Sequence, residues 1–226
     1  MSGRQVSPTG TEGPVRDMTH CVGTPQQRAR ILCAVALRLA APYVAVGIFL
    51  CVLHNAWLAL LAYHAQILAW RRVVRPELAR PRPSAALLFA LPSALAGPVL
   101  YLLLPHITRT DVVGWLARHH LSGAALLLMI PYFGLVHPVL EQIHWGSLRE
   151  RTVLAHAAFA GYHLLVLGSL LTVPWLAACF AVLLAASLLW ERMGRRSGSV
   201  WPAIASQIAA DLGVVLAAWL SAGRFR

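Results

Sequence analysis

The chain has 226 residues, of which 58% are hydrophobic and only 12% are charged, and its mean hydropathy is +0.65. A soluble domain carries about 25% charged residues, so this composition excludes an ordinary soluble protein and indicates a polytopic membrane protein. All 19 basic residues are Arg and the net charge is +11, but the arginines cluster at the ends of apolar segments. That pattern favours anionic membrane lipids as partners rather than nucleic acid, since no basic stripe lies on a polar domain.

The N-terminal segment differs in composition from the rest of the chain. It is polar and rich in Gly, Pro, Thr and Gln, which predicts a disordered tail over residues 1–30 and a transmembrane domain over residues 31–226. No short apolar core of a signal peptide lies near the start, and Met18 is a possible internal start that leaves translation of residues 1–17 open. The four cysteines form no CxxC pair, so neither a disulfide framework nor a zinc site is expected.

Several apolar stretches reach about 20 residues, which is enough to cross a bilayer core, and they predict an all-α bundle of about six spans. We expect Arg30–Ala41 to form an interfacial or partly inserted helix and Tyr43–Trp70 to form the first full span. The later spans are expected over Ser84–Leu104, Leu121–His144, Thr152–Val173, Pro174–Trp190 and Trp201–Ser221. The alternative is a hairpin that breaks near His54 and Asn55, and this break would give seven spans.

The arginine distribution predicts an orientation. Ten arginines follow the first, third and fifth spans and two follow the second and fourth, which places the arginine-rich loops in the cytoplasm. Arg28 and Arg30, beside the membrane at the N-terminal end, argue the other way, and a seventh span would reconcile the two signals. We expect an integral, multi-pass protein of the bacterial cytoplasmic membrane.

Glu141 and Asp211 are acidic residues inside long apolar stretches. An acid near the middle of a membrane helix costs about 2.5–3.5 kcal/mol, so both are candidates for function. His137, Glu141 and His144 share one helical face, and Glu-x-x-His is also the spacing of di-iron bundle proteins. A dimetal site needs a second such pair and further Glu residues, whereas only Asp211 is available. We therefore expect no metal and no cofactor.

Two further apolar segments offer polar side chains. His156 and His163 lie two helical turns apart, and Gln207 and Asp211 lie one turn apart. These groups need partners inside a bundle, where they could meet around a water molecule. His54, His64 and His156 are expected to be histidines of helix interfaces rather than catalytic residues.

These residues carry a resemblance to the CAAX protease and bacteriocin-processing family of intramembrane endopeptidases. The family shows Pro-x-x-Glu-Glu-x-x-x-Arg-Gly, then Phe-x-x-x-His, then His-x-x-x-Asn/Asp, each on its own membrane helix. The matching segments here are Pro138 to Gly146, Phe159 to His163, and Gln207 to Asp211, with Gly198 to Ile204 similar to the lead-in of the third motif.

The resemblance implies an intramembrane peptidase that acts on membrane-associated or prenylated polypeptides. Its first Glu is taken to activate a water molecule, a role that falls on Glu141 here. The histidines and the Asn or Asp order that water or stabilise the oxyanion, which implies roles for His163, Gln207 and Asp211. A carboxylate in an apolar cavity and donors fixed in a low-dielectric site suit this chemistry.

Three departures from the family pattern bear on the chemistry of the site. Gln142 replaces the second Glu, and Gly146 replaces the Arg that would pair with it, so no orphan charge is left buried. Gln207 replaces the second His, and an amide can donate a hydrogen bond but cannot take up a proton at neutral pH. Three hypotheses therefore stay open: an active endopeptidase, a pseudoprotease that binds a membrane client, and a proton-coupled transporter that uses Glu141, Asp211 and the histidines.

Overall fold

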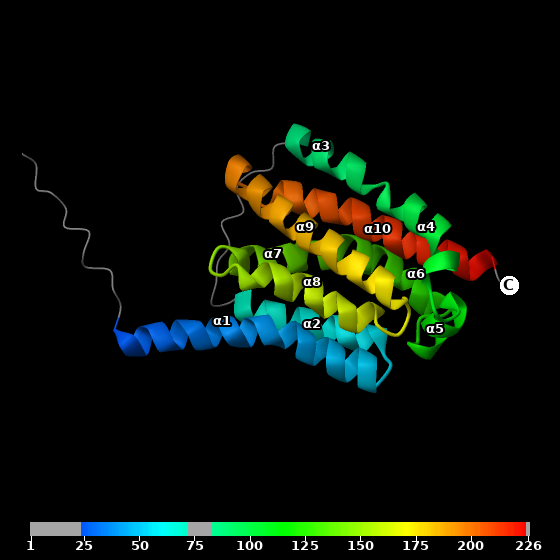
Figure 1. Cartoon of the computed structure of the whole chain (residues 1–226), viewed down its shortest axis with the longest axis horizontal. Coiled ribbons are helices and arrows are strands. Elements are labelled where there is room, and N and C mark those ends of the chain that lie inside the picture. Colours follow the sequence, from blue (N-terminus) through cyan, green and yellow to red (C-terminus); the bar gives the residue numbers. More distant parts are fainter. Residues whose placement is uncertain (1–23, 72–82, 225–226) are drawn as a thin grey trace, which may run out of the picture. The chain divides into compact units, whose positions relative to one another are not determined.

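The computed structural model describes residues 24–71 and 83–224 of the chain (Figure 1). Its helical elements are α1 Pro25–Val46, η1 Gly47–Val52, α2 Ala56–Arg71, α3 Pro83–Ser93, α4 Ala96–Ile107, α5 Val112–Arg118, α6 Ala124–Pro131, η2 Tyr132–Val136, α7 His137–Arg149, α8 Leu154–Leu167, α9 Val173–Ser197 and α10 Trp201–Arg224. Among the described residues the only extended pairing is an isolated bridge between Thr108 and Leu171. The predicted all-α helical bundle is confirmed.

Five helical segments are long and apolar enough to cross a membrane: Pro25–Val52, Ala86–Ile107, Ala124–Arg149, Val173–Ser197 and Trp201–Gly223. Two shorter apolar helices, Ala56–Trp70 and Leu154–Leu167, accompany them within the described ranges. Large apolar side chains cover their outer surfaces, and Leu91, Leu102 and Val182 are 67–70% exposed. Such a surface suits lipid and not water, so the protein is an integral, multi-pass membrane protein.

The N-terminal part of the fold differs from the prediction. By internal contacts the chain divides into residues 1–34 and residues 35–226, and the site described below lies in the longer unit. α1 begins at Pro25, inside the predicted tail, and residues 1–23 of that tail lie outside the described residues. Arg30–Ala41 belongs to this single helix, so the predicted helix bounds were wrong.

The expected span Tyr43–Trp70 is two helices, and the alternative break at His54 and Asn55 is the one observed. His54 adopts a left-handed backbone conformation, with φ at 51°, which ends η1. The Asn55 side-chain oxygen accepts a hydrogen bond from the Leu58 amide at 2.9 Å and so begins α2. Asn is among the residues preferred at a helix start, and this local signal separates the two helices.

The third predicted span contains a short π-helical segment, η2, between α6 and α7. This segment brings Gly134 against the Leu212 side chain of α10, where a Cβ atom on Gly134 would overlap that leucine. π-Helical segments within α-helices are frequent at functional sites. Here η2 directly precedes the helix that carries Glu141.

A close contact between backbones fixes α10 against α4. A Cβ atom on Gly97 would lie 2.7 Å from the Gly213 Cα atom, and one on Gly213 would lie 2.8 Å from the Gly97 backbone nitrogen. Small residues at a membrane helix interface allow this approach. α10 also contacts α3, α7 and α9, so its polar face lies inside the bundle (Figure 1).

Candidate functional site

Glu141 lies at the centre of the candidate site, and its side chain is fully buried on α7. Its Oε1 atom accepts hydrogen bonds from the Tyr63 hydroxyl, at 3.1 Å, and from the Tyr162 hydroxyl. Its Oε2 atom accepts a hydrogen bond from the Gln207 amide and lies 3.4 Å from His137 Nε2. A buried carboxylate is costly unless it is hydrogen-bonded, and these four side chains supply the partners.

The partners of Glu141 converge from several helices. α7 packs against α2, α8 and α10, which carry Tyr63, Tyr162 and Gln207 respectively (Figure 1). His137 precedes Glu141 by one turn on α7 itself, so the two side chains share a face. The site therefore depends on the packing of four helices around one carboxylate.

Gln207 joins the two acids that stood out in the sequence. Its Nε2 atom donates to Glu141 Oε2 and also to Asp211 Oδ2, at 3.1 Å. Gln207 is buried, and Asp211, one turn further along α10, is partly buried. The structure thus brings together three of the four residues proposed for the site, namely Glu141, Gln207 and Asp211.

His163, the fourth proposed residue, has no direct hydrogen bond to Glu141 in the described part of the chain. Its Nδ1 atom lies 2.8 Å from the Phe159 carbonyl oxygen on the same helix. A carbonyl oxygen only accepts, so Nδ1 carries the proton in this arrangement and Nε2 is the acceptor. The ring packs against Tyr162, with the centroids 4.1 Å apart, so the neighbouring tyrosine makes the contact with Glu141 instead.

A chain of side chains, called the histidine chain below, runs from Tyr132 through His64 and His137 to Glu141. The Tyr132 hydroxyl lies 2.9 Å from His64 Nδ1, and His64 Nε2 lies 3.0 Å from His137 Nδ1. His64 is a helix-interface histidine, and it is also part of the environment of Glu141. This connection depends on the packing of α2 against η2 and α7, so no pattern within a single helix could reveal it.

The two tyrosines that donate to Glu141 were also missed. Tyr63 and Tyr162 lie in apolar stretches and look like core aromatic residues. A buried tyrosine needs a partner for its hydroxyl, and this requirement was the available signal. Tyr63 also accepts a hydrogen bond from Trp145 Nε1, at 2.8 Å, which fixes its ring beside α7.

A second series of contacts, called the amide chain below, leaves Glu141 in another direction. Gln142 Nε2 donates to Gln207 Oε1 at 2.6 Å, and Arg149 Nη1 donates to Gln142 Oε1 at 2.9 Å. Arg149 Nε donates to Ser187 Oγ at 2.9 Å, and its guanidinium group lies 5.3 Å from the centre of the Phe159 ring. The guanidinium group that contacts Gln142 is therefore that of Arg149, at the end of the same helix.

His144 was predicted to share a face with Glu141, but it makes no hydrogen bond to it. His144 is buried, and neither ring nitrogen has a hydrogen-bond partner among the described residues. Its ring meets Tyr63 and Trp145 edge to face. Of the two histidines near Glu141 on α7, His137 therefore belongs to the site and His144 does not.

His137, Glu141 and Asp211 form a group whose potential metal-ligating atoms all lie within 4.8 Å of one another. A meeting of two acids and an imidazole was expected from the sequence, but with His163 in the place that His137 occupies here. The Gln207 Nε2 atom donates to both acids, so an N–H group now faces the gap between the two carboxylates.

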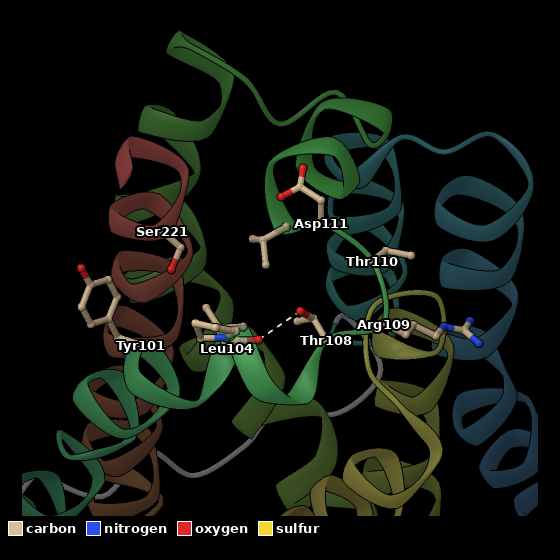
Figure 2. Close-up of a pocket in the computed structure, with 9 residues that line it drawn as sticks. Tyr101, Leu104, Thr108, Arg109, Thr110, Asp111 and Ser221 are labelled. Atoms are coloured by element: carbon tan, nitrogen blue, oxygen red, sulfur yellow. Dashed lines mark hydrogen bonds between the residues drawn. The ribbon is translucent and has the colours of Figure 1, made fainter. Parts of the chain in front are cut away.

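Figure 2 shows a cavity of about 330 Å³ elsewhere in the bundle, between α4, the start of α5 and the end of α10. It is lined by Tyr101, Leu104, Pro105, Thr108, Arg109, Thr110, Asp111, Val112 and Ser221. Asp111 accepts a hydrogen bond from the Gly114 amide at 2.6 Å, and Arg109 donates to the Ser169 carbonyl oxygen at 3.3 Å. These polar groups hold loops together, and the lining includes none of the residues around Glu141.

Comparison of the chain with protein-family models, with curated proteins and with solved structures finds no match.

Proposed function

We propose that the protein is an intramembrane endopeptidase similar to the CAAX protease and bacteriocin-processing family, with Glu141 as the general base. The observation that carries this proposal is the contact of Gln207 with both Glu141 and Asp211 inside a membrane bundle. Residues of the first and third motifs meet there, and the helix of the second motif contributes Tyr162. A cluster of this kind from distant parts of the chain is the usual form of a catalytic site.

In the proposed reaction, the substrate peptide and a water molecule enter beside Glu141 and displace one of its present donors. Glu141 takes a proton from the water as the water oxygen attacks the peptide carbonyl carbon. Donors such as Gln207 Nε2 stabilise the oxyanion that forms. The carbon–nitrogen bond then breaks, and the proton held by Glu141 passes to the leaving amine.

The test uses the purified protein in vesicles with a library of membrane-associated peptides, analysed by mass spectrometry. Glu141→Gln should reduce cleavage by about 10²–10⁴-fold, because an amide cannot act as the base. Glu150→Gln is the matched control, since Glu150 is an exposed carboxylate on the same part of the chain. Cleavage that survives Glu141→Gln at the wild-type rate would reject the proposed base.

The second candidate function is a pseudoprotease that binds a membrane or prenylated client without cutting it. Three hydrogen bonds and His137 already surround the two Glu141 oxygens, so one of these partners must move before a water molecule can take its place. This candidate expects cross-linking of a photoreactive prenylated peptide without cleavage, and new cleavage in Gln207→His. Wild-type cleavage that depends on Glu141 would exclude it.

We further propose that both shorter helices also cross the membrane, which gives seven spans in the bacterial cytoplasmic membrane. The arginine-rich segments that follow α2, α7 and α9 then share the cytoplasmic side with the N-terminus, against anionic lipid. In a background without the native cysteines, a membrane-impermeant thiol reagent applied to intact cells should label His120→Cys but not Arg195→Cys. The reverse pattern would invert the proposed orientation.

A further inference from the structure

The amide chain has a donor-only group at one end and acceptor groups at the other. Arg149 is buried at the last turn of α7, and its guanidinium group can only donate hydrogen bonds. Glu141 and Asp211 end the chain with carboxylate oxygens. Gln142 and Gln207, both buried, lie between these ends, and each can in principle be turned over by rotation of its amide.

The two ends together determine how both amides are turned. Arg149 Nη1 lies 2.9 Å from Gln142, so the atom that faces it must be the Gln142 oxygen. Gln142 then presents its nitrogen to Gln207, at 2.6 Å, and the facing atom of Gln207 must be its oxygen. The Gln207 nitrogen is left to face the two carboxylates, where it makes two hydrogen bonds.

The opposite orientation places like groups together at both ends. If both amides were reversed, the Gln142 nitrogen would face the Arg149 guanidinium, and the Gln207 oxygen would face Glu141 and Asp211. An unmade hydrogen bond at a buried polar group costs about 1–3 kcal/mol, and here contacts at both ends would be lost. Both buried amides therefore have one preferred orientation, and the Arg149 guanidinium group determines it.

We propose that Arg149 is a positioning residue that, through Gln142, holds Gln207 as a hydrogen-bond donor toward the gap between Glu141 and Asp211. The same orientation excludes a divalent cation from His137, Glu141 and Asp211. A cation there would need oxygen or nitrogen lone pairs on every side, whereas Gln207 presents N–H groups. This assignment rests on the proposed function only in giving Gln207 an oxyanion to face during hydrolysis.

Gln142→Glu tests the order of donors and acceptors in the amide chain, because the new side chain has nearly the same shape as the old one. The new carboxylate still accepts from Arg149 but cannot donate to Gln207, so Gln207 turns its nitrogen to that carboxylate and its oxygen to the gap. His137, Glu141, Asp211 and the Gln207 oxygen then form a ligand set for a divalent cation. Arg149→Met releases the same constraint from the other end, and Arg149→Lys, which keeps a donor-only group, is the matched control.

The measurement is a Co²⁺ titration of the purified, tag-free protein, followed by visible absorption. Gln142→Glu and Arg149→Met should bind Co²⁺ at this site at least about tenfold more tightly than wild type and Arg149→Lys. Substitutions of residues that orient the direct ligands change metal affinity on this scale. Adding Asp211→Asn to either responding variant should remove the gain, which separates this site from surface histidines.

Two outcomes would overturn the proposal. One is Co²⁺ binding by wild type that Asp211→Asn abolishes, because the amide would then not exclude the cation. The other is a folded Gln142→Glu protein with no gain in affinity, since Gln207 would then not have turned. Neither outcome depends on peptide cleavage, so a failure of the proposed function and a failure of this assignment are distinguishable.

Discussion

The histidine chain and the amide chain both end at Glu141, but they differ in whether their direction can reverse. Each imidazole or hydroxyl of the histidine chain can donate or accept, depending on its tautomer. The amide chain begins at a guanidinium group, which only donates, and its direction is fixed from that end. One side of Glu141 can therefore adjust when a proton moves, and the other side cannot.

A buried carboxylate that takes part in proton transfer needs both a fixed hydrogen-bond donor and a partner that can change its protonation state, and the two chains each supply one of these. A fixed donor stabilises negative charge without reorganisation, as the Gln207 amide does on the side of Asp211. An adjustable partner allows the protonation state to change, and His137 is suited to that role. The proton-coupled transporter alternative would move protons through the histidine chain, Glu141 and Asp211, whereas the endopeptidase proposal also needs the fixed Gln207 amide as a donor to the oxyanion.

Replacing Glu141, at which the histidine chain and the amide chain meet, should have the largest effect on the free energy of unfolding. Glu141→Leu leaves the Tyr63 and Tyr162 hydroxyls and the Gln207 amide without acceptors, and it should lower the free energy of unfolding by about 4 kcal/mol. Glu141→Gln keeps one acceptor oxygen and should cost less. Thermal unfolding in detergent measures both, and equal losses would show that the donors do not depend on Glu141.

A change at the start of the amide chain should have the next largest effect. Arg149→Met removes the donor to Gln142 and the contact with Ser187, and it should lower the free energy of unfolding by about 2–3 kcal/mol. Arg149→Lys retains a cation near Gln142 and should cost less than half as much. If the methionine variant were as stable as wild type, the buried guanidinium group would not be needed to order the amides.

The corresponding change in the histidine chain should be milder. His64→Phe removes the contacts with Tyr132 and His137, but Tyr132 is partly exposed and His137 keeps its contact with Glu141. We expect a loss of about 1–2 kcal/mol. Unfolding of His64→Phe beside Arg149→Met makes the comparison direct, and a larger loss at His64 would reverse the order assigned to the two chains.

His119 gives the smallest expected effect and a reference histidine outside both chains. It follows α5, away from the membrane-spanning segments, and burial lowers its pKa from an ordinary value near 6.5, although its bond to the Trp115 carbonyl opposes the shift. The folded state disfavours the proton, so this contribution to stability is present above pH 6.5 and is lost as the pH falls toward the lowered pKa. In a series of melting temperatures measured at different pH values, His119→Gln should make stability less sensitive to acid. If the variant and wild type lost stability equally with falling pH, His119 would not contribute to this pH dependence.

The sequence was informative where a single helix determines the arrangement. The costly acids Glu141 and Asp211 and the one-turn spacing of Gln207 and Asp211 could be recognised because helical periodicity places them. Contacts between helices could not be derived, because they depend on which faces meet. Tyr63 and His64 reach the site only through the packing of α2 beside α7, and no local pattern encodes that packing.

Local signals also explain the outcome at His54 and Asn55. Hydropathy alone favours one long span there, because the residues on either side are apolar. The left-handed His54 and the capping Asn55 end one helix and begin the next within two residues. A capping residue decided the number of helices where average hydropathy could not.

The contact between Gly97 and Gly213 has a consequence for how this protein can vary. Gly213 lies only two residues beyond Asp211, and its backbone touches that of α4 with no room for a side chain. A methyl group at either glycine would push α10 away from α4 and shift the Gln207 and Asp211 side chains relative to Glu141. In homologues or designed variants, both positions should therefore remain glycine, because the clash is with backbone atoms, although neither glycine touches the reacting groups.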